Sequence, residues 1–77
     1  MVSKLEEAIA ALRELGCYRI AERIHRSRDD RKLMVATSCF YELCHNAAAY
    51  PLRRAQHVAV INRLHEALVE LEAGEKR

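Results

Sequence analysis

The side chains in this sequence best suited to metal or acid–base chemistry are its four histidines and three cysteines. Imidazole and thiolate are the usual ligands of zinc. On a helix, however, a pair of ligands must share one face, and Cys39 and Cys44 are five positions apart, which separates them by about 140°. The sequence contains neither a C-x-x-C nor an H-x-x-x-H pair. We therefore predict no metal and no other cofactor, and we expect the cysteines to be free, reduced thiols.

One pair of side chains suggests an enzyme. Arg19 precedes His25 with five residues between them, a spacing similar to the R-x(4–6)-H element of HEPN-type ribonucleases. The resemblance implies that both side chains act on an RNA phosphodiester, but so short an element does not assign the chain to that family. No serine has a base at an activating spacing, and no glycine-rich phosphate loop is present. We predict that the chain is not an enzyme, and an RNA-cleaving enzyme is the third hypothesis.

The segment from residue 19 to residue 32 is rich in arginine. Its basic strip consists of Arg19, Arg23, Arg26 and Arg31. Such a strip can contact phosphates, but DNA-recognition helices usually present Ser, Thr, Asn or Gln to base edges, and the net charge of the chain is only +2. A solvated polar face is the first interpretation of the strip. An acidic protein partner and a nucleic-acid partner are the two alternatives.

Two short helices are predicted before residue 29. Ser3 and Glu6 fit a capping box, so the first helix should begin at Lys4. Gly16 suits the left-handed cap that would end this helix near Leu15. A second helix of about three turns follows, and its apolar residues form one narrow stripe. Each of these helices therefore needs only one buried side.

The next predicted helix lies in the stretch from residue 31 to residue 50, ends between Asn46 and Ala49, and is apolar on more than one side. Asp29 or Asp30 is expected to cap its first turn. Its main face is expected to carry Leu33, Ala36, Phe40, Leu43, Cys44 and Ala47. Other apolar residues flank this face, and the solvent side is left with only Val35, Ser38, Glu42, His45 and Asn46. Because such a helix must be surrounded, we expect a second protein to cover part of it.

Pro51 separates this helix from a last one, which is predicted to run to about Ala73. Proline disfavours helical geometry at the preceding residue but suits the first position of a helix. The chain therefore either turns back at residues 46–50 as a hairpin, which we favour, or continues as a kinked rod. A coiled-coil spacing relates His57, Ile61, Leu64, Leu68 and Leu71. At His57 we expect a neutral imidazole that donates to a backbone carbonyl, with a pH-sensitive interface histidine as the alternative.

These patterns predict one all-α domain over residues 1–77, with frayed ends at 1–3 and 74–77. The fold class is a small four-helix bundle with two shorter N-terminal and two longer C-terminal helices, assembled as a dimer. A hydrophobic content of 51% and a charged content of 31% fit such a protein. No apolar run is long enough to cross a bilayer, so we expect a cytoplasmic protein without membrane contact.

The predicted function is that of a small regulatory or inhibitory protein that acts through protein–protein contact, as a homodimer and without catalysis. The expected interface consists of Met34, Phe40, Tyr41, His57, Val58, Ile61, Leu64 and Leu68. A second protein, acidic in one alternative, is the further expected partner. The runner-up is a nucleic-acid-binding regulator that uses the basic strip.

Overall fold

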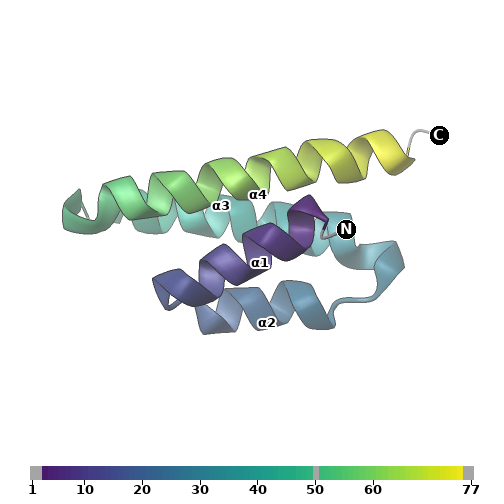
Figure 1. The fold of residues 1–77 in the computed structure, drawn as a ribbon, viewed down its shortest axis with the longest axis horizontal. Helices are drawn as coiled ribbons and strands as arrows, with labels where there is room; N and C mark the ends of the chain where they lie inside the picture. Colours follow the sequence, from purple (N-terminus) through teal and green to yellow (C-terminus); the bar gives the residue numbers. More distant parts are fainter. Residues whose placement is uncertain (1–2, 50, 76–77) are drawn as a thin grey trace.

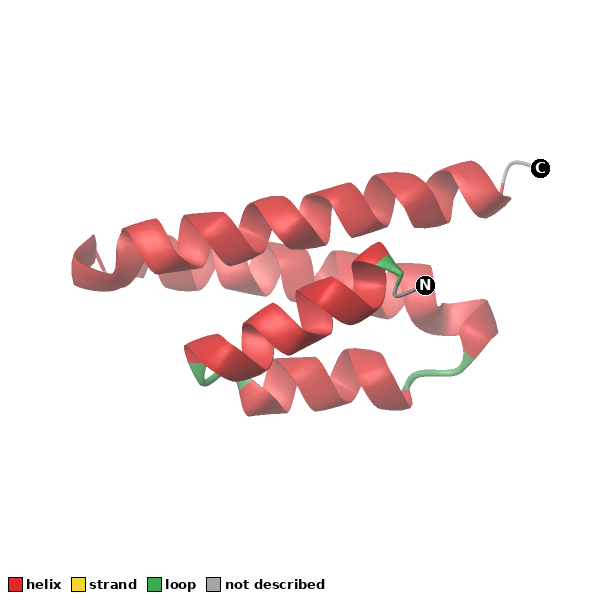
Figure 2. Cartoon of the chain, viewed as in Figure 1, coloured by secondary structure: helices red, strands yellow, loops and turns green. Residues whose placement is uncertain are grey.

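The computed structural model describes residues 3–49 and 51–75. Its elements are α1 (Lys4–Leu15), α2 (Tyr18–Arg26), the 3-10 turn η1 (Asp29–Arg31), α3 (Lys32–Ala49), the 3-10 turn η2 (Pro51–Arg53) and α4 (Arg54–Glu75). Figure 1 shows successive helices running in opposite directions around the bundle, and Figure 2 shows how short the connecting loops are. Each helix packs against two others, so that α1 contacts α2 and α4 while α3 contacts the same two helices. The predicted all-α four-helix bundle is confirmed.

Local sequence signals set both ends of α1, as predicted. The Ser3 hydroxyl accepts a hydrogen bond from the Glu6 backbone N–H at 3.1 Å. At the other end, Gly16 has a φ of 94°, a left-handed conformation in which a side chain would be strained. The Gly16 N–H donates to the carbonyl of Arg13 at 3.0 Å, and the next N–H donates to that of Leu12 at 2.8 Å. This turn reverses the chain into α2.

The expected aspartate cap before α3 is wrong. The 3-10 turn η1 leads straight into α3, and the first residue before this turn is Arg28, without a side-chain cap. The Arg31 N–H donates to the carbonyl of Arg28 at 2.9 Å, and the Lys32 N–H donates to the carbonyl of Asp29. Because backbone carbonyls accept these bonds, no carboxylate cap is needed, and the carboxylate of Asp30 instead lies 3.3 Å from the Arg28 guanidinium.

The connection between α3 and α4 is a sharp turn, as favoured from the sequence. Helix α3 ends at Ala49, within the predicted range of 46–49, and η2 begins at Pro51, so the turn is tighter than the five-residue segment 46–50 that was predicted. Helix α4 then packs antiparallel along α3, which rules out a kinked rod (Figure 1). At the end of α4, Gly74 and Glu75 are helical rather than frayed, whereas Ser3 serves as an ordered cap. The remaining positions predicted as frayed lie outside the described residues.

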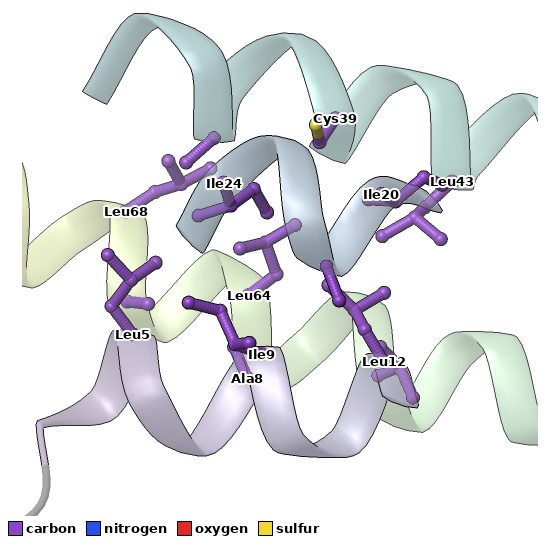
Figure 3. Packing of buried hydrophobic residues seen from close by; sticks show 14 residues of the cluster. Leu5, Ala8, Ile9, Leu12, Ile20, Ile24, Cys39, Leu43, Leu64 and Leu68 are labelled. Carbon is purple, nitrogen blue, oxygen red and sulfur yellow. The ribbon is translucent and has the colours of Figure 1, made fainter. Parts of the chain in front are cut away.

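The core lies along the axis of the bundle and receives side chains from all four helices (Figure 3). Its largest fully buried side chains are Leu12, Ile24, Cys39, Leu43 and Leu64. In Figure 3 these side chains point toward one another from opposite helices, with Leu64 of α4 at the centre of the cluster. A single chain therefore forms a complete core.

The buried side of α3 differs from the predicted one. Cys39 is fully buried, whereas Cys44, expected on the main face, is exposed. Val35, expected to face water, is partly buried against the core, and Phe40 is only partly buried. The reason is the position of α2, which packs against α3 and is tied to it by the ion pair between Arg23 and Glu42. The core side of α3 is thus rotated toward α2.

Candidate functional site

The outward surface of α3 is almost free of charge. In its 18 residues the only charged side chains are Lys32 and Glu42. Both are engaged with α2, since the Lys32 ammonium donates to the carbonyl of Ile24 at 3.3 Å and the Glu42 carboxylate accepts from Arg23 at 2.7 Å. Over a length of about 27 Å, the rest of this helix surface is uncharged. Charge depletion of this kind is typical of the centre of a protein interface.

Five residues on the side of α3 opposite Cys39 follow a heptad-like spacing of three and four. We name them the outer seam: Met34, Thr37, Tyr41, Cys44 and Ala48. Met34 is 61% exposed and Tyr41 is 69% exposed. The Thr37 hydroxyl donates to the Leu33 carbonyl at 2.7 Å, so this side chain offers its methyl group to a partner. The outer seam has the pattern of a coiled-coil contact without a facing helix.

A groove between α3 and α4 continues this apolar surface. Its volume is about 230 Å³, and its walls include Phe40, Tyr41, His65, Val69 and Glu72. The Phe40 ring packs edge-on against that of Tyr41 at a centroid distance of 5.7 Å and lies 5.8 Å from the His65 ring. On α4, Val58 and Val69 are 42% and 54% exposed. We refer to the outer seam and this groove together as the α3–α4 face.

The structure divides the predicted interface residues into two groups. Met34, Phe40 and Tyr41 lie on the α3–α4 face, whereas Val58 is exposed on α4 next to this face, seven positions before His65, and Ile61 is partly buried. The other three, His57, Leu64 and Leu68, are buried within the single chain. The side of α4 that carries the coiled-coil spacing faces the core because α1 packs against it. The spacing therefore identified a contact within the chain and not a contact with a second chain. We remove His57 and Leu64 from the proposed interface, whereas Leu68, although only 9% exposed, also lines the groove of the α3–α4 face.

His57 has the geometry expected of a core imidazole. It is only 6% exposed, and its Nδ1 lies 2.9 Å from the carbonyl oxygen of Arg53, one turn earlier in the chain. Since a carbonyl only accepts, the imidazole N–H is the donor.

Sequence reasoning did not include His65 in the interface, although it lies seven positions after Val58 and so on the same side of α4.

The basic strip is partly neutralised within the chain. Arg23 pairs with Glu42 at 2.7 Å, and Arg26 pairs with Glu22 at 3.1 Å. Glu22 also accepts from Arg13, and this hydrogen bond is the main reason why the pKa of the Glu22 carboxyl is lowered. Among the described residues, Arg19 and Arg31 have no carboxylate within ion-pair distance. Half of the predicted strip is therefore paired within the chain, Arg23 with α3 and Arg26 within α2.

The other groups capable of chemistry are not brought together. Arg19 and His25 are both exposed on α2, but six positions separate them, so they point about 120° apart. Burial raises the pKa of the Cys39 thiol, which is therefore protonated at neutral pH and packs as an apolar group. Across residues 3–49 and 51–75, no three His, Cys, Asp or Glu side chains are grouped to hold a metal ion.

A second cavity, of about 370 Å³, lies between α1 and α4. Its walls combine Ala11 and Ala59 with the charged side chains of Glu14, Arg53 and Arg63. Arg53 also donates to the Leu15 carbonyl at 3.3 Å, so it links the end of α1 to the start of α4. Since small residues and opposite charges line this cavity, it lacks the apolar enclosure of a ligand pocket.

Within the part of the chain that the structure describes, no helix combines the length and apolar content of a membrane span. Comparison of the chain with protein-family models, with curated proteins and with solved structures found no match.

Proposed function

We propose that this protein acts by binding other protein chains through its α3–α4 face, and that it forms a homodimer there. The observation that carries the proposal is the outer seam, which is exposed, uncharged and apolar although the chain already has a complete core. Exposed apolar patches of several hundred Å² are uncommon on monomers and mark interaction surfaces. We propose a regulatory or inhibitory role for the dimer, without catalysis.

The size of the α3–α4 face suits a protein partner. The bundle measures 40 × 22 × 19 Å, so one long side offers on the order of 800 Å², which is the area that a standard interface takes from each partner. Tyrosine and methionine are enriched at the centres of such interfaces, where lysine and glutamate are depleted. Met34 and Tyr41 supply the first kind of side chain, and no residue of the outer seam is of the second kind.

A nucleic-acid or acidic protein partner for the basic strip is the weaker proposal. Only Arg19 and Arg31 are left for such a partner, because Arg23 and Arg26 already pair with carboxylates.

Location in the cytoplasm is part of our proposal, since the structure keeps Cys17, Cys39 and Cys44 as free thiols.

The test compares two tyrosine variants by gel filtration with light scattering. Wild-type protein should have about twice the 8.9 kDa mass of the chain, and its unfolding should depend on protein concentration. Tyr41→Glu should give a folded monomer, because the dimer would bury an unpaired carboxylate. Tyr18→Glu is the matched control, since Tyr18 on α2 is similarly exposed at 64%, and this variant should remain a dimer.

Circular dichroism establishes that both variants are folded. A wild-type protein that is monomeric at micromolar concentration would overturn the homodimer. Dissociation by Tyr18→Glu but not by Tyr41→Glu would move the interface away from the α3–α4 face.

A further inference from the structure

We propose that the second copy packs antiparallel on the α3–α4 face, so that α3 lies against α3 and α4 against α4, with the two-fold axis at the level of Tyr41 and His65. This inference rests on the proposed homodimer and specifies its geometry. Three features of the chain support it: the residue sizes along the outer seam, the relative level of the two helices, and the distribution of charge along α4.

The outer seam is complementary to itself only when reversed. Met34 and Ala48 lie seven positions before and after Tyr41, so an antiparallel copy centred at Tyr41 places each Met34 opposite Ala48 of the second copy. In the same arrangement Thr37 faces Cys44 of the second copy. A large side chain thus meets a small one at each end of the seam, and medium-sized side chains meet between them. Alternation of large and small residues is what allows two helices to interdigitate.

The same axis passes through the middle of the exposed side of α4. The Phe40 and His65 rings are 5.8 Å apart, so Tyr41 and His65 stand at one level of the bundle. On α4, Val58 and Glu72 lie seven positions before and after His65. A single two-fold axis therefore centres both helices of the α3–α4 face, as an isologous interface requires.

The charges along α4 also favour the antiparallel copy. Arg54 lies near its N-terminal end and Glu72 near its C-terminal end, on the side that borders α3. Antiparallel packing centred at His65 places Glu72 opposite Val58 of the second copy, and Arg54 of that copy lies one turn, or about 6 Å, further along the helix, where its long side chain can reach the carboxylate. The other two-fold arrangement has its axis parallel to the helices and lays α4 over α3 of the second copy. It would press Glu72 against the uncharged seam near Met34, which costs desolvation of the carboxylate without a cation to compensate.

Disulfide trapping distinguishes the two arrangements. In the antiparallel dimer, Cys44 is offset from Cys44 of the second copy by six residues, or about 9 Å along the helix, which is too far for a disulfide. Thr37→Cys should bond to Cys44 of the second copy when the protein is oxidised with glutathione disulfide, giving a covalent dimer on a non-reducing gel. The matched control, Thr37→Cys with Cys44→Ser, should give none.

Two further variants make the result decisive. Tyr41→Cys in a Cys44→Ser background should link to itself across the axis and give a covalent dimer. Asn62→Cys should not link to Cys44 of the second copy, because these residues meet only when α4 crosses over α3. Light scattering on the reduced proteins separates the two proposals. A dimer that is trapped through Asn62→Cys and not through Thr37→Cys overturns the antiparallel geometry alone, whereas a monomer overturns the homodimer as well.

Discussion

The N-terminal half of the bundle and helix α3 differ in how many charged residues their surfaces carry. Helix α1 carries five charged residues in 12, and its neighbour α2 shares a chain of ion pairs with it in which Glu22 lies between Arg13 and Arg26. Helix α3 carries two charged residues in 18, and both are turned toward α2. Helices α1 and α2 thus have a single buried side, whereas α3 has two apolar sides. The difference shows that a complete core does not account for all the apolar residues of a small protein.

The largest expected effect tests which side of α3 is buried. Val35→Glu should unfold the chain, because the carboxylate would enter a partly buried position against the core, and its cost, on the order of 3 kcal/mol, matches the stability of a domain this small. Ser38→Glu, at an exposed position of the same helix, should change stability by less than about 0.5 kcal/mol. Urea unfolding followed by circular dichroism measures both. Equal stability of the two variants would contradict the rotation of α3 toward α2.

An intermediate effect compares the two glycines. Gly16→Ala should destabilise the protein by about 1 kcal/mol, because alanine is strained at the left-handed φ of 94°. Gly74→Ala should stabilise α4 by a few tenths of a kcal/mol, because Gly74 is helical and open space surrounds its Cα. Thermal unfolding of the two variants should therefore shift in opposite directions. If both variants shifted in the same direction, the turn between α1 and α2 would accommodate alanine at position 16 without strain.

The smallest effect concerns the charged half. The hydrogen bond from Arg13 lowers the pKa of Glu22 from its ordinary value of 4.5, so the carboxylate contributes stability above that value and loses it as the pH falls through the lower folded value. Wild-type protein should therefore melt slightly above Glu22→Gln at neutral pH, and this difference should vanish once the pH has fallen below the folded pKa of Glu22. Because Glu22 is exposed to salt, about 1 M NaCl should also remove the difference. A melting difference between the two proteins that grows as the pH falls would contradict the lowered pKa of Glu22.

Local signals in the sequence were sufficient for α1 and favoured a turn before Pro51. The cap at Ser3 and the left-handed turn at Gly16 depend on residues within four positions, so spacing alone reveals them. The burial of His57 and its bond to a carbonyl were also foreseen from its place among aliphatic residues. Proline disfavours helical geometry at the preceding residue, which made the hairpin the favoured alternative but left a kinked rod open until the packing of α4 on α3 was known.

Contacts between distant segments account for what the sequence did not reveal. The rotation of α3 depends on where α2 packs, and no pattern within residues 31–50 reports that position. The coiled-coil spacing of α4 was real, but a spacing alone does not say whether the facing helix belongs to the same chain or to another. For this reason Leu64 was expected at an interface and lies in the core, whereas the neighbouring side of α4 has the exposed valines.

The closure of the bundle by α1 and α4 has a consequence for synthesis on the ribosome. Helix α1 packs on α4, and Leu64 and Leu68 of α4 cover the apolar stripe of α1 (Figure 3). The first helix to emerge must therefore wait for the last one before its core exists. Until then α2 covers only part of the apolar sides of α1 and α3, and the rest of these sides stays exposed. The core of this bundle is thus completed only after α4 has left the exit tunnel.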